Sequence, residues 1–210
     1  MFIGKYNRSI ILTYAGVLCA VVGMFCAFNN NFKFAIGLLI IAGICDMFDG
    51  KVARGMKRSK EDIWFGIQLD SLADTIDFVV FPCVVGFCLG MQSWYHIIGY
   101  AFLCMAGVQR LSHFNVLVLN KKDDKPIKCY TGLPVTSTAI SFPFLWVLFE
   151  VLNKYCGVGQ DVYFIFYTIF VYLSAFLFIF KIKIPKFKGI AYPILSIIAV
   201  LAIIALIFFI

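Results

Sequence analysis

Four aspartates, in two neighbouring apolar stretches of the chain, have the type and the spacing for metal-assisted chemistry. The pattern is Asp46-x-x-Asp49-Gly50-x-x-Ala53-Arg54, followed by Gly66-x-x-x-Asp70-x-x-x-Asp74. Carboxylate oxygens are the ligands that Mg²⁺, Mn²⁺ and Ca²⁺ prefer. A carboxylate can also take the proton of an attacking hydroxyl group. Because the 210-residue chain has only 11 acidic residues, four of them at such regular intervals indicate a functional site.

Helical geometry places these aspartates on two faces that can meet. At about 100° per residue, positions 46, 49, 50 and 53 share one face of a helix, and positions 66, 70 and 74 share a face of the next, with Asp77 on the same stripe. Four ionised carboxylates in an apolar pocket must be protonated, paired with cations or bound to metal. Lys51 and Arg54 can neutralise only part of this charge. We therefore predict a site for two divalent ions, Mg²⁺ or Mn²⁺.

The composition predicts that the helices carrying these residues lie in a membrane. Apolar residues make up 62% of the chain and charged residues 14%, whereas a soluble domain has roughly 45–50% and about 25%. A helix needs about 20 apolar residues to cross the hydrocarbon layer. We expect an all-α polytopic membrane protein, a single domain over residues 1–210, with a bundle of six to seven transmembrane helices. The candidate spans are 9–28, 33–53, 66–90, 94–119, 133–152, 161–180 and 189–210.

The basic residues predict the orientation of these spans. With the N-terminus in the cytoplasm and seven spans, the lysines and arginines at 5–8, 51–60, 121–128 and 181–188 all fall inside, together with the aspartate site. Cys129 then lies inside and Cys156 outside. The net charge of +7 belongs to short loops that face anionic lipid headgroups, which argues against nucleic-acid binding. Six spans followed by a re-entrant or interfacial helix over 189–210 is the alternative.

The aspartate pattern resembles the signature of the CDP-alcohol phosphotransferase (phosphatidyltransferase) family at every fixed position. The match covers positions 46–74, and the gap between Arg54 and Gly66 is slightly longer than is common in that family. The resemblance implies that a CDP-linked lipid such as CDP-diacylglycerol gives up CMP to an alcohol. It also implies three groups of roles: metal ligation by Asp46, Asp49, Asp70 and Asp74, general-base catalysis by Asp74, and nucleotide binding by Gly50, Ala53, Arg54 and Gly66.

Three further stretches resemble the phosphatidylserine synthase branch of that family. They are residues 69–74, 110–115 and 130–134. Two departures are His113, where that branch more often has a second arginine, and Asp77 with Val79, which replace the usual Ser and Gly. Arg110 suits the carboxylate of an acceptor, with His113 assisting, or else pairs with an aspartate such as Asp77. We expect L-serine as the acceptor, with glycerol 3-phosphate, inositol phosphate and choline as alternatives.

A cation transporter lined by the same aspartates is the competing hypothesis from another class of protein. Intramembrane carboxylates also mark ion pathways. Transporters of many families show internal repeats, however, and we find none in this sequence. We expect Gly86-x-x-x-Gly90 to form a close helix contact, either between two copies of the chain in a homodimer or within one copy.

Overall fold

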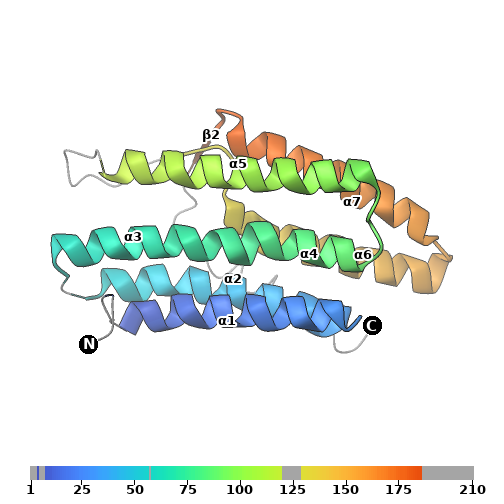
Figure 1. Ribbon diagram of the computed structural model, residues 1–210, viewed down its shortest axis with the longest axis horizontal. Coiled ribbons are helices and arrows are strands. Elements are labelled where there is room, and N and C mark those ends of the chain that lie inside the picture. The colour runs from blue at the N-terminus through green and yellow to red at the C-terminus, as the bar shows by residue number, and fades with distance from the viewer. Residues whose placement is uncertain (1–3, 5–7, 57, 120–128, 186–210) are drawn as a thin grey trace.

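The computed structural model describes residues 4, 8–56, 58–119 and 129–185, which form a bundle of long helices (Figure 1). The helices are α1 (Arg8–Phe28), α2 (Phe32–Arg54), α3 (Lys60–Asp74), α4 (Phe81–Cys88), α5 (Trp94–Leu119), α6 (Thr138–Cys156) and α7 (Gln160–Ile179). Two short strands, β1 (Cys129–Thr131) and β2 (Lys183–Pro185), pair antiparallel beside them. The prediction of an all-α polytopic protein is confirmed, and the predicted span over 189–210 lies outside the described residues.

Five helical segments in the described part of the chain are long and apolar enough to cross a membrane. The longest, Lys60–Cys88, joins α3 and α4 through a six-residue π-helix, η1 (Thr75–Val80). The remaining long helix, α2, has 23 residues but carries Lys33, Asp46, Asp49, Lys51 and Arg54, so its apolar stretch is interrupted by charge. Many large apolar side chains on the outer faces of the bundle are exposed, as expected for surfaces that contact lipid. The chain is therefore a multi-pass integral membrane protein.

Local sequence signals explain where the helices begin and end. The third predicted span starts at 66, but α3 begins at Lys60, because Ser59 and Asp62 form a capping box that satisfies free amides of its first turn. The turn between α1 and α2 contains Asn30 at φ 58°, a left-handed conformation that asparagine tolerates. Helix α6 ends at Cys156 and is capped by Gly157, which adopts the left-handed conformation at φ 66°.

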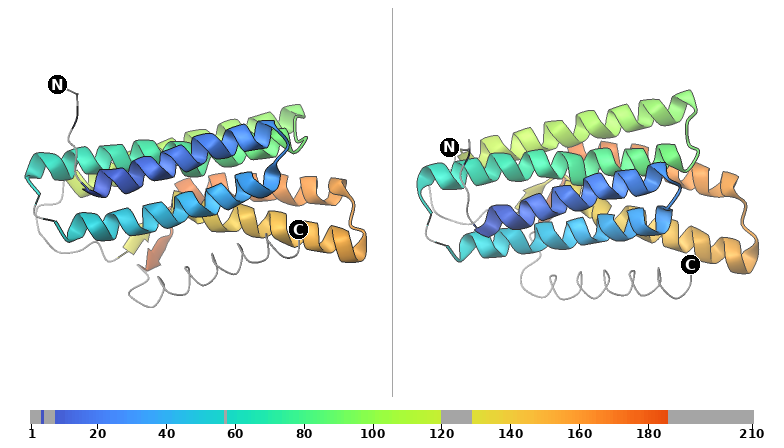
Figure 2. Two further views of the ribbon diagram at one scale, coloured as in Figure 1. Left: turned by 90° about the horizontal axis from the view of Figure 1, so that it is seen from below. Right: turned by 60° about the horizontal axis from the view of Figure 1, so that its bottom comes forward.

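The arrangement of helices puts α1 beside both α2 and the α3–α4 segment (Figure 2). Helix α5 packs along α7, and α2 packs against α6. Close contact of α1 with α4 depends on Gly23, because a Cβ atom there would overlap the ring of Phe81. The consequence is a three-helix group, α1, α2 and α3, in which the two predicted aspartate faces meet alongside a third helix.

The π-helix and Pro82 interrupt the backbone hydrogen bonds in the middle of the long α3–α4 segment. Proline has no amide hydrogen, so the carbonyl of Phe78 lacks the partner that residue 82 would normally supply. The hydroxyl of Thr138 in α6 donates to this carbonyl at 2.7 Å, and the Tyr167 hydroxyl in α7 donates to the carbonyl of Pro82 at 2.7 Å. Polar backbone groups within a membrane need such partners. The irregular segment is therefore built into the packing of the bundle.

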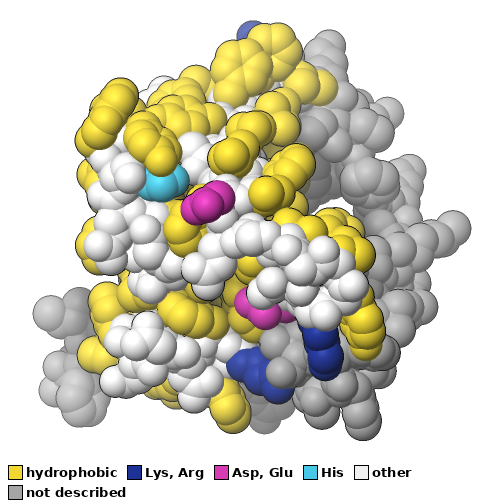
Figure 3. Space-filling view, turned by 90° about the vertical axis from the view of Figure 1, so that its right-hand side faces the viewer, with side chains coloured by type: hydrophobic (Ala, Val, Ile, Leu, Met, Phe, Trp, Pro, Cys, Tyr) yellow, Lys and Arg dark blue, Asp and Glu magenta, His cyan; other side chains and the backbone are white. Residues whose placement is uncertain are grey.

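The two ends of the bundle differ in charge. The end at which α2 finishes and α3 begins carries Lys51, Arg54, Arg58 and Lys60. Figure 3 views the opposite end, where the described residues show few charged side chains among apolar and uncharged ones. The turns α1–α2, α4–α5 and α6–α7 lie at that end (Figure 1).

Candidate active site

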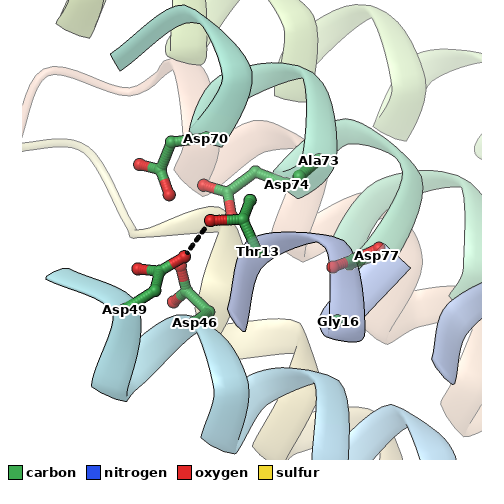
Figure 4. A pocket seen from close by; sticks show the side chains of 8 residues that line it. All are labelled: Thr13, Gly16, Asp46, Asp49, Asp70, Ala73, Asp74 and Asp77. Atoms are coloured by element: carbon green, nitrogen blue, oxygen red, sulfur yellow. Dashed lines mark hydrogen bonds between the residues drawn. The ribbon is translucent and has the colours of Figure 1, made fainter. Parts of the chain in front are cut away.

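A small cavity lies among α1, α2, α3 and η1. Its walls are mostly carboxyl groups and small residues, and Figure 4 shows the eight that line it. They are Thr13, Gly16, Asp46, Asp49, Asp70, Ala73, Asp74 and Asp77. All four aspartates that the sequence singled out are thus brought together in one pocket.

Three of the aspartates form a set of oxygen donors suited to a divalent cation. One carboxylate oxygen each from Asp46, Asp49 and Asp70 lies within 4.8 Å of the others. Asp46 and Asp49 come from α2 and face Asp70 from α3 across the cavity (Figure 4). Hard cations such as Mg²⁺ and Mn²⁺ take ligands of this type. The residues therefore fit the predicted metal site.

Asp74 lies one turn beyond Asp70 and is buried, with 8% of its surface exposed. Its carboxyl group is in side-chain hydrogen-bond contact with that of Asp46. Two carboxyl groups so close must share a proton or a cation, because two ionised groups would repel each other. Asp74 is thus in contact with one member, Asp46, of the set formed by Asp46, Asp49 and Asp70.

The first helix contributes a residue that the sequence analysis missed. The hydroxyl of Thr13 donates a hydrogen bond of 2.7 Å to Oδ2 of Asp49 (Figure 4). Asp49 is 6% exposed, so this donor fixes the orientation of a buried carboxylate. Partners of this kind orient metal ligands and affect the affinity for the metal. The polar side chain of Thr13 inside the apolar span 9–28 could have indicated a functional role. The sequence does not reveal its partner, however, because Asp49 is 36 residues away.

The residues predicted to bind nucleotide lie towards the basic end of the bundle. In α2, the guanidinium of Arg54 lies over Gly50, 3.4 Å from the position that a Cβ atom there would take. Arg58 precedes α3, and one of its guanidinium nitrogens lies 3.6 Å from the position that a Cβ atom on Gly66 would take. Ala53, between Gly50 and Arg54 in sequence, is half-buried. The small residues therefore leave space beside two arginines, of which Arg58 was not anticipated.

Of the two residues predicted to bind the acceptor, Arg110 lies near the cavity residues and His113 is exposed. Arg110 in α5 is buried, and its positive charge attracts the carboxylate of Asp74. The alternative pairing of Arg110 with Asp77 stays a prediction. His113 does not line the cavity. Close by in sequence, Asn115 accepts a hydrogen bond from Ser71 at 2.8 Å, which ties α5 to α3.

The chain is similar to a known protein family and to several known enzymes. The family model described as CDP-alcohol phosphatidyltransferase matches residues 6–180. A CDP-diacylglycerol–serine O-phosphatidyltransferase of Helicobacter pylori is 28% identical over 94% of this chain and 80% of its own length. The enzyme of the same name from Saccharomyces cerevisiae is 37% identical over 47% of this chain, and the match covers 36% of its length. An archaetidylserine synthase of Methanothermobacter thermautotrophicus is 33% identical over 54% of this chain and 46% of its length.

Proposed function

The chain belongs to the CDP-alcohol phosphatidyltransferase family, and from this premise we propose that it transfers the phosphatidyl group of CDP-diacylglycerol to L-serine. The products are phosphatidylserine and CMP. The observation that carries the proposal is the cavity in which oxygens of Asp46, Asp49 and Asp70 converge beside the buried carboxyl of Asp74. The names of the similar proteins support serine over glycerol 3-phosphate, inositol phosphate or choline.

Asp46, Asp49 and Asp70, with Asp74, would hold two divalent ions, Mg²⁺ or Mn²⁺. Bound there, such ions would stabilise negative charge on the pyrophosphate oxygens and make CMP a better leaving group. The distances among the carboxylate oxygens and the presence of hard donors support this assignment. Thr13 serves as the hydrogen-bond donor that keeps Asp49 in its ligating orientation.

Asp74 acts as the general base in the transfer. Its carboxylate accepts the proton of the serine hydroxyl while the hydroxyl oxygen forms a bond to the phosphorus that carries the diacylglycerol. The bond between this phosphorus and the bridging oxygen of the pyrophosphate breaks, and CMP departs with the electron pair. The burial of Asp74 restricts competition by bulk water for the same phosphorus.

Arg110 is suited to bind the carboxylate of serine. Its guanidinium is a planar donor that can form two parallel hydrogen bonds with a carboxylate. Because its charge already acts on Asp74, a serine carboxylate held by Arg110 would bring the serine hydroxyl close to the base. His113, which is exposed, is the second acceptor-binding residue in this proposal.

Gly50, Ala53, Arg54 and Gly66 bind the cytidine nucleotide in this proposal. The two glycines allow close approach of the ligand to the backbone. Arg54 and Arg58 offer positive charge to the phosphates at the end of the bundle where α2 finishes and α3 begins. We place this end, and with it the N-terminus, in the cytoplasm, because basic residues are concentrated on cytoplasmic loops. Residues 1–210 would then form a single membrane domain.

The test is CMP release by the purified protein in detergent with CDP-diacylglycerol and one acceptor at a time. The panel consists of L-serine, glycerol 3-phosphate, inositol phosphate, choline and ethanolamine. Serine should give the highest rate, EDTA should abolish it, and Mg²⁺ or Mn²⁺ should restore it. A higher rate with another acceptor would refute serine but leave the family assignment intact. Ion flux through proteoliposomes without CMP release from any acceptor would favour the transporter hypothesis.

A further inference from the structure

A fifth aspartate, Asp77, lines the same cavity and has no role in the chemistry described above. It is 3% exposed, and its Oδ1 atom has no hydrogen-bond partner within the part of the chain that the structure describes. It lies in the π-helix η1, and π-helical turns within longer helices are often found at functional sites. A buried carboxylate with an unsatisfied oxygen is unfavourable unless a ligand supplies the missing donor.

The packing around Asp77 keeps space for its carboxyl group. A Cβ atom on Gly16 in α1 would lie 2.9 Å from Oδ2 of Asp77, a closer approach than side chains tolerate. Figure 4 shows the two residues next to each other, beside the main group of aspartates. Glycine at position 16 is therefore required for the orientation of Asp77. Asp77 does not belong to the group of Asp46, Asp49 and Asp70, whose carboxylate oxygens lie close enough together to hold a metal ion.

The groups facing Asp77 would attract a cation. The carboxyl groups of Asp46 and Asp49 from α2 and of Asp74 from α3 act on it electrostatically. The thiols of Cys19 on α1 and Cys45 on α2 also interact with it electrostatically. This part of the cavity is thus lined by negative and neutral groups, and a positively charged donor would satisfy the unpartnered oxygen.

We propose that Asp77 binds the ammonium group of the acceptor and so selects an amino alcohol. This inference rests on the proposed function. An ammonium group has three hydrogen-bond donors and matches an unpartnered carboxylate oxygen. In serine the hydroxyl and the ammonium are on adjacent carbons, and Asp74 and Asp77 are about one helical turn apart on the same segment. Serine could therefore place its hydroxyl at Asp74, its ammonium at Asp77 and its carboxylate at Arg110.

The first measurement compares L-serine with 3-hydroxypropanoate, which lacks only the amino group, as acceptors for the unmodified enzyme. We expect kcat/KM to be roughly ten- to hundredfold higher for serine, because a hydrogen bond to a charged group is lost with the analogue. In Asp77→Asn, this preference should largely disappear through a higher KM for serine. The KM for CDP-diacylglycerol and the rate with 3-hydroxypropanoate should change little. Equal use of the two acceptors by the unmodified enzyme would overturn the proposal without any variant.

The matched control is Glu150→Gln, which neutralises another partly buried carboxyl group in a membrane helix that does not line the cavity. It should leave the acceptor preference unchanged. Removing an unpaired buried charge should not lower the melting temperature of Asp77→Asn. A lower melting temperature with an unchanged preference would make Asp77 a structural residue, and a higher requirement for Mn²⁺ with an unchanged KM for serine would make it a metal ligand. Either result refutes the proposal but not the serine transferase, whereas failure of the unmodified enzyme to use serine refutes both.

Discussion

Replacing Thr13 by valine tests whether α1 takes part in the metal site. Valine has nearly the same shape but cannot donate the 2.7 Å hydrogen bond to Oδ2 of Asp49. Asp49 would keep its place in α2 and its burial, but its carboxylate would lose the donor that fixes its orientation. We expect the main effect on metal affinity, because Thr13 does not itself contribute a carboxylate to the three-oxygen set.

The size of the effect follows from that single hydrogen bond. A hydrogen bond to a charged group contributes about 1.5–3 kcal/mol. Since about 1.4 kcal/mol corresponds to a tenfold change in an equilibrium constant, the metal concentration for half-maximal activity should rise roughly ten- to hundredfold. The same range is typical when a residue that supports a metal ligand is replaced. At saturating metal, the maximal rate should recover to near that of the unmodified enzyme.

The assay is CMP release from CDP-diacylglycerol and serine by protein first treated with EDTA and then titrated with Mn²⁺. The control is Thr168→Val in α7, whose hydroxyl donates to the carbonyl of Phe164 in its own helix at 2.6 Å. This control makes the same chemical change in another membrane helix and should not alter the metal requirement. If Thr13→Val required no more Mn²⁺ than Thr168→Val, the orienting role of Thr13 would be wrong.

Three further predictions concern the base, the acceptor and the topology. Asp74→Asn should lower turnover by roughly 10²–10⁴-fold, as is typical when a general base is lost, with a much smaller change in CDP-diacylglycerol binding; near-normal turnover would point to Asp70 instead. Arg110→Lys should reduce kcat/KM for serine roughly ten- to hundredfold, because a point charge cannot reproduce the guanidinium fork, and an unchanged value would argue against carboxylate binding there. In intact cells, an impermeant thiol reagent should label the exposed Cys156 but not a cysteine introduced by Ser59→Cys, and the reverse labelling would invert the proposed orientation.

Much of the fold and the core of the site could be predicted because both depend on local periodicity. Long apolar stretches identify helices that cross a membrane, and α5 has the bounds predicted for the fourth span. The helical period also placed Asp46 and Asp49 on one face of α2 and Asp70 and Asp74 on one face of α3. Because these helices are consecutive and antiparallel, the meeting of the two faces followed from the sequence order. The start of α3 was predicted six residues too late. The residues before Gly66 are polar and were assigned to a loop, although Ser59 and Asp62 form a capping box there.

The contribution of α1 could be decided only by tertiary structure. Periodicity describes the faces of one helix but does not state which other helix packs against them. The close packing of α1, allowed at Gly23, brings Thr13 to Asp49 and Gly16 to Asp77 across intervals in sequence that carry no pattern. In the same way, the sequence placed Arg110 late in a span, but its attraction to Asp74 depends on how α5 lies against α3.

For Asp77, too, the sequence and the tertiary structure determine different properties. The sequence determined that an aspartate follows Asp74 on the same stripe, in a position where the resembling enzymes usually have serine. Asp77 is buried in the π-helix η1, where Thr138 donates to the carbonyl of the next residue and Gly16 leaves space for the Asp77 carboxyl group. These are contacts between residues distant in the chain, and their free energies depend on packing in three dimensions. The sequence alone thus determined which chemical groups are available, and the tertiary structure decided which of them lie close enough to act together.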